Sequence, residues 1–270
     1  MEFLAVNSLS MKDVRTEAVI LDNLSFTIGK NECLGIVGES GSGKSMTVKA
    51  MLGLVNPWLH VTGSASFNGK DMLQLDDKSL RNIRGSHICM IFQDAMSAFN
   101  PLYTIGYQLI ETLEEKMHLA KKEARQLIIA ELERVGLRQV PQVLQKYPHQ
   151  LSGGMLQRCM IAIAVAIKPD IIIADEPTTA LDAITQGEVI HLLHNLKDEL
   201  GIALIFISHD LGVIQDLADH VFVMQEGKQM EYGTVEKVFK YPKNDYTKYL
   251  IQTRKKLSYT FEQAIRKDNS

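Results

Sequence analysis

The chain has 270 residues, of which 46% are hydrophobic and 23% charged, so it can form one large globular domain or a domain with a subdomain. Its net charge of −3, with no long basic block, gives no indication of nucleic-acid binding. Its longest apolar run, "CMIAIAVAI", is far shorter than the roughly 20 residues that cross a bilayer, and its three scattered cysteines favour reduced thiols over a disulfide framework.

Strands alternate with helices along the chain, which predicts an α/β fold with a mostly parallel sheet flanked by helices. A helical block at about 94–168 interrupts the α/β pattern. In chain order we expect a strand at 32–37, a helix at 44–55 that Pro57 ends, a strand at 87–93, a helical stretch at 104–147, and strand patterns at 170–176, 202–210 and 220–233.

The glycine-rich stretch "GESGSGKS" at residues 38–45 follows one of these strands and precedes a helix. It matches the phosphate-binding pattern G-x-x-x-x-G-K-[ST] in the context that the pattern requires, which argues against a chance glycine turn. Glycines leave the backbone N–H groups open to phosphate oxygens, Lys44 adds a positive charge, and the Ser45 hydroxyl suits Mg²⁺. The stretch therefore predicts a nucleotide site.

Polar side chains close several of the expected strands. Asp175 and Glu176 follow an apolar run, where they could reach Mg²⁺ and polarise an attacking water. Gln93 and His209 end two other strands, where an amide could reach metal or water and an imidazole could reach the γ-phosphate. Each of these residues alone is more often structural or solvent-facing, so its assignment depends on the nucleotide site upstream.

A second candidate phosphate cradle lies in "QLSGGMLQR" at residues 150–158. Ser152 is a good N-cap for the helix-like run that follows, and the two glycines let another molecule approach the backbone closely. A helix start of this kind favours anions because of its free N–H groups and its dipole. One chain therefore carries two candidate cradles.

In this order, "GESGSGKS", "FQD", "LSGGMLQR", "IIIADEPTTALD" and "ISHD" resemble the ATP-binding cassette (ABC) ATPases, and the likeness covers nearly the whole chain. The resemblance implies a P-loop NTPase core with an antiparallel N-terminal β part and an inserted helical subdomain. It implies a single ABC ATPase domain over 1–270, with a nucleotide-binding core at about 1–93 and 169–240, a signature subdomain at about 94–168 and a tail at 241–270.

In that family the P-loop of one cassette and the signature motif of a second close over the same ATP, which would explain the two cradles. The resemblance implies that Glu176 is the catalytic base, His209 the switch and Gln93 the lever. It places Mg²⁺ on Ser45, Gln93 and Asp175. The residues it implies for binding ATP are Gly38, Glu39, Ser40, Gly41, Ser42, Gly43, Lys44, Ser45, Met46, Ser152, Gly153, Gly154 and, as an inter-subunit contact, Asp182.

The sequence departs from the family pattern at two places. Met155 stands where the signature commonly ends in Gln. The family usually stacks adenine on an aromatic side chain roughly where residues 15–19 lie, but no aromatic residue occurs between Phe3 and Phe26. Arg15 is a candidate for that stacking role.

"SAFNPL", "YPHQLSGGMLQR" and "YPKNDYTKYLI" resemble the importer ATPases for oligopeptides, dipeptides and nickel. "SGGMLQR" is most similar to the nickel-importer ATPases of the NikD type, whereas the peptide relatives usually have Arg after that Met and a longer C-terminal extension. The expected cargo is nickel, a related metal or a metal–chelator complex, with dipeptides or oligopeptides as the alternative. Exporters remain a further alternative, while ATPases of DNA repair or translation would need a long coiled coil or a second cassette.

The resemblance also implies partners: a sister cassette or a second copy of this chain, two membrane permease subunits and an extracytoplasmic substrate-binding protein, but no nucleic acid. The chain would then lie peripherally on the cytoplasmic face of the membrane. Phe99 and Tyr103 are expected on the surface that meets the membrane subunits. His191, His194 and Asp198 share a helical face and could bind a metal weakly, but an apolar stripe on another face favours simple solvent exposure for them.

Overall fold

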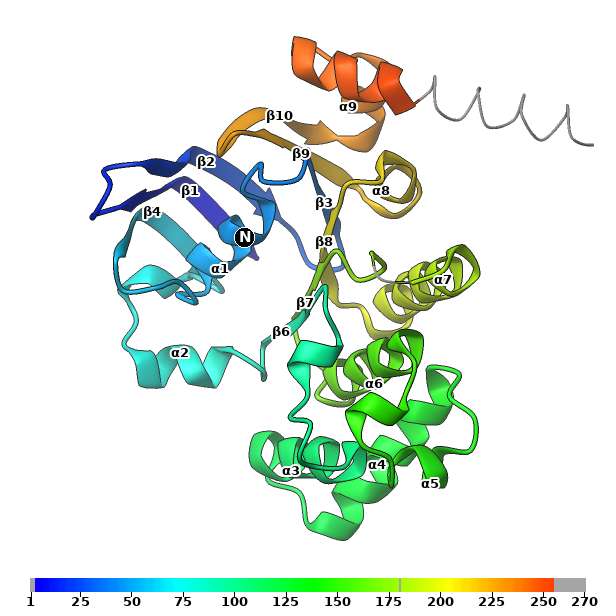
Figure 1. Ribbon diagram of the computed structural model, residues 1–270. Coiled ribbons are helices and arrows are strands. Elements are labelled where there is room, and N and C mark those ends of the chain that lie inside the picture. The colour runs from blue at the N-terminus through cyan, green and yellow to red at the C-terminus, as the bar shows by residue number, and fades with distance from the viewer. Residues whose placement is uncertain (1–2, 180, 255–270) are drawn as a thin grey trace, which may run out of the picture. The chain divides into compact units, whose positions relative to one another are not determined.

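The structure is a computed structural model that describes residues 3–179 and 181–254. The chain forms two compact units (Figure 1). Unit 1 consists of Met1–Gln74 and Phe206–Ser270, and unit 2 consists of Leu75–Ile205. Within the described residues, no helix is both long and apolar enough to pass through a bilayer.

Unit 1 contains a mixed sheet in the strand order β5-β4-β1-β2-β10-β9-β3. Its first half is antiparallel, because β1 pairs with β2 on one side and with β4 on the other, as the resemblance implied for the N-terminal part. In its second half β3 pairs with β9 in parallel, and β10 joins the halves by parallel pairing with β2. The strands are β1 (Leu4–Asp13), β2 (Val19–Ile28), β3 (Cys33–Val37), β4 (Leu59–Phe67), β5 (Lys70–Asp71), β9 (His220–Gln225) and β10 (Lys228–Thr234).

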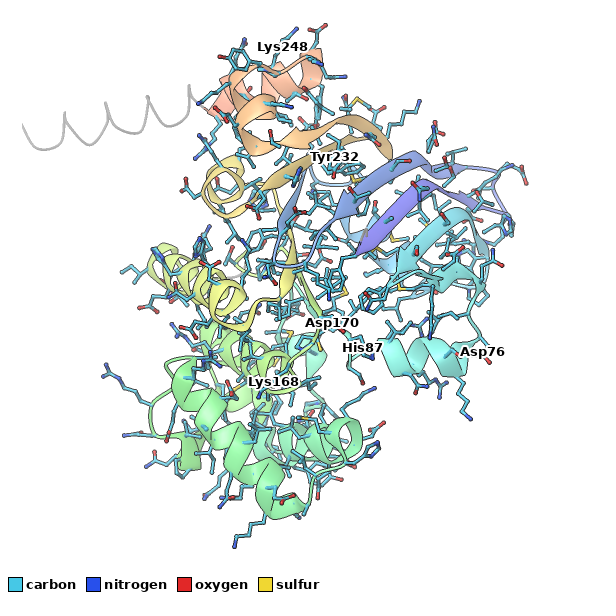
Figure 2. The ribbon with its side chains drawn as sticks, turned by 180° about the vertical axis from the view of Figure 1, so that it is seen from behind. Asp76, His87, Lys168, Asp170, Tyr232 and Lys248 are labelled. Atoms are coloured by element: carbon cyan, nitrogen blue, oxygen red, sulfur yellow. The ribbon has the colours of Figure 1, made fainter. Side chains whose placement is uncertain are left out.

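The core of unit 1 lies where the two halves of this sheet meet. All five residues of β3 are buried, as is typical of a strand that is covered on both faces. Phe26 of β2 and Phe222 of β9 pack with their ring centroids 5.0 Å apart. The Tyr232 hydroxyl on β10 donates a hydrogen bond to the Thr27 carbonyl at 2.8 Å and so ties β10 to β2 (Figure 2).

The helices of unit 1 are α1 (Lys44–Met51), α8 (Leu211–Leu217), α9 (Val235–Lys240), the short η1 (Met72–Gln74) and a helical segment at 245–254. The expected helix at 44–55 is shorter than predicted. It ends at Met51 because Gly53 adopts a positive φ of 62° and its N–H returns to the Ala50 carbonyl, so Pro57 is not what stops it.

Unit 2 contains the helical block. Nine of the 14 residues of α6 are buried, so this helix is covered on most of its circumference and forms the centre of the block. Ala124, Ile128 and Leu132 of α4 recur at every fourth position and are all fully buried. The helices are α2 (Asp77–Ile83), η2 (Met96–Ala98), α3 (Ile105–Met117), α4 (Lys121–Arg134), α5 (Val140–Val143), η3 (Pro148–Gln150), α6 (Gly153–Ala166) and α7 (Ala183–Leu200).

Two parallel strands of unit 2 position the strand-end polar residues. β6 (Ile88–Ile91) pairs with β7 (Ile171–Asp175), and β8 (Ala203–Ser208) follows β7 in the strand order. The chain passes from unit 2 to unit 1 within β8, after Ile205. His87 Nδ1 and Asp170 Oδ2 lie 2.6 Å apart where β6 and β7 begin (Figure 2). Because both strands run in the same direction, the polar residues that end them emerge at one edge.

The expected strands are confirmed, each within a few residues of its predicted bounds. The strand pattern at 220–233 divides into β9 and β10, because Glu226 and Gly227 between them adopt positive φ angles of 48° and 74°. Phe99 was expected on the surface that meets the membrane subunits, but this prediction is wrong because Phe99 is only 9% exposed. Tyr103, expected on the same surface, is 47% exposed, and the neighbouring Leu102 is 78% exposed.

Candidate nucleotide-binding site

The loop that follows β3 has a shape that only glycine allows at two positions. A Cβ at Gly38 would lie 2.2 Å from the Met224 carbonyl oxygen. Gly43, the N-cap of α1, has a φ of 99°, and a Cβ there would lie 2.9 Å from Leu21. The turn between β9 and β10 braces the loop further, because the Gly227 N–H donates to the Ser42 carbonyl at 3.0 Å.

This loop encloses the side chain of Lys44, which is only 4% exposed. Lys44 Nζ donates hydrogen bonds to the carbonyl oxygens of Gly38 and Glu39, both at 3.0 Å. The Ser42 hydroxyl oxygen is buried and has no hydrogen-bond partner among the described residues. A buried ammonium, an orphaned hydroxyl and the first turn of α1 together form a cradle suited to phosphate oxygens.

In unit 2, Gln93 and Glu176 meet at the edge where β6 and β7 end. Gln93 Nε2 donates to Glu176 Oε2 at 3.2 Å, and Thr179 Oγ1 donates to the same oxygen at 3.1 Å. Asp175, the last residue of β7, is only 6% exposed. Glu176 has a positive φ of 45°, which is uncommon for a residue other than glycine and is typical of constrained functional sites.

His209 lies in unit 1, directly after β8 and before α8. The flanking residue Asp210 is the N-cap of α8, and its carboxylate accepts the Gly212 N–H at 2.7 Å. The Asp210 N–H in turn donates to the Ser208 hydroxyl at 2.9 Å. These two bonds fix the backbone on the C-terminal side of His209.

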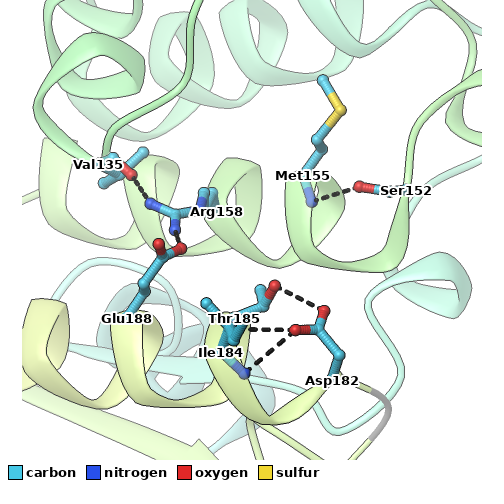
Figure 3. Close-up of polar contacts among 8 residues, drawn as sticks. All are labelled: Val135, Ser152, Met155, Arg158, Asp182, Ile184, Thr185 and Glu188. Carbon is cyan, nitrogen blue, oxygen red and sulfur yellow. Dashed lines mark hydrogen bonds and ion pairs between the residues drawn. The ribbon is translucent and has the colours of Figure 1, made fainter.

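The second cradle is a surface hollow of about 460 Å³ in unit 2. Ser152 is the N-cap of α6, with its hydroxyl accepting the Met155 N–H at 3.3 Å (Figure 3). Gly154 is required here, since a Cβ would lie 2.8 Å from Thr185 of α7. The start of α6 can therefore lie close to α7, and Ser152, Gly153 and Gly154 line the hollow.

Asp182 lines the same hollow as the N-cap of α7 (Figure 3). Its carboxylate accepts the Thr185 hydroxyl at 2.7 Å and the N–H groups of Ile184 and Thr185, both at 3.1 Å. The hydrogen bond from the Thr185 hydroxyl is the main cause that lowers the pKa of Asp182. The side chain therefore stays ionised at neutral pH.

An ion pair that the sequence did not suggest closes one side of this hollow. Arg158 of α6 donates to Glu188 of α7 and to the carbonyl of Val135, which follows α4, both at 2.5 Å (Figure 3). Arg158 thus joins three segments around the signature stretch. Met155, the departure from the family pattern, has a side chain that points away from Asp182 (Figure 3).

Near the N-terminal strands, Arg15 has a partner that the sequence did not identify. Its guanidinium carbon lies 4.4 Å from the centroid of the Trp58 ring. Arg15 also donates to both carboxylate oxygens of Asp13, at 3.1 and 2.8 Å, and this hydrogen bonding lowers the pKa of Asp13 to about 2. Trp58 is the sole tryptophan of the chain, and this was the only feature of the sequence that could have pointed to it as a partner of Arg15.

The remaining candidate metal site has little support. His194 Nδ1 and Asp198 Oδ2 lie 3.4 Å apart on α7. Across residues 3–179 and 181–254, no group of three or more His, Cys, Asp or Glu side chains is arranged to hold a metal ion.

The loop after β3, the strand-end carboxylates and the signature hollow define the class of ATP-hydrolysing cassettes, and comparison with known proteins agrees. Residues 21–179 match the family model for the ABC transporter. The chain is 44% identical over 268 residues to the metal-staphylopine import system ATP-binding protein CntD of Staphylococcus aureus (strain NCTC 8325 / PS 47), with 99% of each chain covered. It is 46% identical over 230 residues to the dipeptide transport ATP-binding protein DppD of Bacillus subtilis (strain 168), covering 84% of this chain and 69% of the relative.

Solved structures confirm the predicted fold class. The dimeric post-hydrolysis structure of the ATP-binding cassette MJ0796 with ADP and Pi has a TM-score of 0.76 and 28% identity, over 86% of this chain and 98% of that one. CbiO1 from Clostridium perfringens, part of the transporter complex cbiONQ, has a TM-score of 0.74 and 29% identity, over 89% of this chain and 91% of that one. The chain belongs to the ABC transporter family and is an ATPase of its oligopeptide, dipeptide and nickel importer branch.

Proposed function

We propose that this ATPase powers the import of a metal ion or a metal–chelator complex. The observation that carries the proposal is the 44% identity to the metal-staphylopine import ATPase, which extends over 99% of both chains. The signature stretch "SGGMLQR", with Leu156 after Met155, supports the same branch. A dipeptide or oligopeptide is the second candidate cargo, and the 46% identity to the dipeptide transport ATPase favours it.

We propose that ATP binds with its phosphates in the loop at residues 38–45, where the backbone N–H groups, Lys44 and Ser42 surround them. Ser45, Gln93 and Asp175 offer the hydroxyl, amide and carboxylate oxygens that Mg²⁺ prefers, and the bound ion would neutralise phosphate charge. The cradle geometry supports this assignment through the buried Lys44 ammonium and the orphaned Ser42 hydroxyl.

Glu176 is the proposed general base, which accepts the proton of the water that attacks the γ-phosphorus. Gln93 and Thr179 orient its carboxylate by their hydrogen bonds to Oε2. His209 would contact the γ-phosphate from the end of β8. The Ser152 and Gly154 surface of a second cassette would cover the same phosphate, with Asp182 at the contact between the cassettes, so each ATP lies between two subunits.

For the assembly, we propose a dimer with a sister cassette or a second copy, two membrane permease subunits and an extracytoplasmic substrate-binding protein. The chain would lie on the cytoplasmic face of the membrane as a peripheral subunit. We retain the division into a nucleotide-binding core at about 1–93 and 169–240, a signature subdomain at about 94–168 and a tail at 241–270.

Uptake by cells that lack the gene for this chain tests the cargo. We expect reduced uptake of radiolabelled nickel, supplied alone or with a staphylopine-type chelator, and unchanged uptake of a labelled dipeptide. Re-expression of the wild-type chain should restore metal uptake, whereas the matched variant Glu176→Gln should not. Normal metal uptake together with lost dipeptide uptake would favour the peptide assignment instead.

A further inference from the structure

The segment at 241–254, which follows α9, reaches the phosphate-binding loop of the same unit. The Tyr246 hydroxyl accepts a hydrogen bond from the Glu39 N–H at 3.2 Å. Glu39 is the second residue of "GESGSGKS", and the two partners lie 207 positions apart in the sequence. A residue of the C-terminal segment thus holds the backbone of the loop directly.

That contact bears on Lys44 through a single peptide group. The group between Gly38 and Glu39 donates its N–H to Tyr246 and accepts Lys44 Nζ on its carbonyl oxygen at 3.0 Å. Because a peptide group is planar and rigid, a rotation of its N–H also moves its carbonyl. Tyr246 and Lys44 therefore fix the same rigid unit from opposite ends.

The start of the segment is anchored well enough to hold Tyr246 in place. The Glu231 carboxylate on β10 accepts the N–H groups of Lys243 and Asn244, at 3.0 and 3.2 Å. The Asn244 side-chain oxygen then accepts the Tyr246 N–H at 2.8 Å, which begins the helical segment at 245–254. These three hydrogen bonds anchor the residues that lead into Tyr246.

The buried face of the helical segment packs near β3, which precedes the loop, and α8, which follows His209. Thr247 is 2% exposed and Ile251 is 8% exposed, and they share a small apolar cavity with Val37, which immediately precedes the loop, and Leu211 of α8. Near the end of the described segment, Arg254 Nη1 donates to Gln215 Oε1 of α8 at 3.3 Å. Partial burial raises the pKa of Tyr246, so its hydroxyl is neutral at physiological pH and acts as a hydrogen-bonding group.

We propose that Tyr246 is a positioning residue for ATP binding, which sets the Gly38–Glu39 peptide and, through it, the place of Lys44 in the loop. The hydroxyl oxygen of Tyr246 is essential for this role, because it is the atom that accepts the hydrogen bond from the Glu39 N–H. This inference rests on the proposed assignment of residues 38–45 to the phosphates of ATP. It gives the C-terminal segment a part in the reaction beyond packing.

The test compares Tyr246→Phe with the matched control Tyr249→Phe in the full chain. Tyr249 is on the same helical segment and is 55% exposed. We expect Tyr246→Phe to raise the Kd and KM for ATP roughly 2- to 10-fold, the effect of one hydrogen bond, and to leave kcat within about twofold. Tyr249→Phe should change neither. In hydrogen exchange, the Glu39 amide should exchange faster in Tyr246→Phe than in the wild-type protein or the control.

All measurements are made at a temperature where circular dichroism shows each variant fully folded, so that a change in Tm does not mimic the effect. A wild-type ATP affinity or an unchanged Glu39 exchange rate in Tyr246→Phe would overturn the positioning role. Lys44→Ala distinguishes a failure of the loop assignment from a failure of the role of Tyr246. If Lys44→Ala binds ATP normally, the assignment of the loop fails; if it binds ATP weakly while Tyr246→Phe binds it normally, only the role of Tyr246 fails.

Discussion

Gln93 Nε2 donates a hydrogen bond to Glu176 Oε2 at 3.2 Å, so two strand-end side chains that are 83 positions apart in the sequence meet in unit 2. Thr179 donates to the same carboxylate oxygen at 3.1 Å. Two donors on one oxygen fix the orientation of the carboxylate. A carboxylate held in one orientation suits the proposed role of Glu176 as general base, and its positive φ of 45° is of the kind that clusters at functional sites.

Replacement of Glu176 by Gln should stop hydrolysis while ATP binding persists. The loop at 38–45 keeps its charge and its N–H groups, but the attacking water loses its base, so kcat should fall by about 10²- to 10⁴-fold. The variant should accumulate as an ATP-bound dimer, visible by size-exclusion chromatography. Thr179→Val is the control, because it removes one orienting bond and keeps the carboxylate, and it should lose far less activity. Near wild-type turnover in Glu176→Gln would refute the assignment of the base.

Arg15 and Trp58 should contribute to adenine binding. The Arg15 guanidinium carbon lies 4.4 Å from the centroid of the Trp58 ring, and the Arg15 side chain is 58% exposed, so it is accessible to a base that stacks on it. Arg15→Ala should raise the Kd for ATP about 2- to 5-fold, consistent with a contact of about 0.5–1 kcal/mol. Arg15→Tyr should restore affinity. The control is Lys12→Ala on β1, shortly before the turn that holds Arg15, which removes an ion pair with Glu17 at the surface. Equal affinity in Arg15→Ala and the wild type would exclude the stacking role.

The sequence predicts those parts of the molecule whose signals are local. "GESGSGKS" specifies its own turn and its own phosphate cradle, and the strand-end positions of Gln93 and Glu176 follow from apolar runs that stop. Contacts between distant segments leave no such mark. The Tyr246 bond to the loop and the cover that buries Phe99 depend on tertiary packing, so the sequence could not predict them.

The cysteines should be unreactive in the folded protein. Burial raises the pKa of both Cys89 and Cys159 to about 12, and Cys33 is fully buried. A raised pKa keeps a thiol protonated at neutral pH, and the thiolate is the reactive species. We therefore expect negligible labelling by a thiol reagent under native conditions and three labelled cysteines in guanidinium chloride. Rapid native labelling of any one of them would show that its surroundings open.

Charge placed on the exposed apolar segment before α3 should uncouple ATPase activity from transport. Leu102 is 78% exposed, and Tyr103 stacks on Tyr107 with ring centroids 4.9 Å apart, so these side chains form an apolar surface suited to a membrane subunit. Leu102→Asp should leave the basal ATPase rate of the isolated chain unchanged and abolish transport in the assembled system. Tyr241→Asp, at a residue that is 74% exposed in unit 1, is the control and should transport normally. Normal transport by Leu102→Asp would remove this surface from the interface.

The final prediction concerns the two phosphate cradles, which lie in different units of the chain. Lys44→Ala removes the charge from the loop, and Ser152→Arg fills the hollow of about 460 Å³ at the start of α6. If each ATP lies between the loop of one subunit and the signature of the other, either homodimer has two damaged sites and should hydrolyse almost no ATP.

In a mixed dimer of the two variants, one site combines the intact Lys44 of one chain with the intact Ser152 of the other, and the second site carries both defects. Mixing two inactive proteins should therefore restore part of the ATPase activity, at protein concentrations high enough for self-pairing. If the chain pairs only with a sister cassette, Ser152→Arg should instead block hydrolysis of the ATP held by the loop of the sister. Wild-type activity in either single variant would contradict a site shared between subunits, because every shared site in such a homodimer carries the defect.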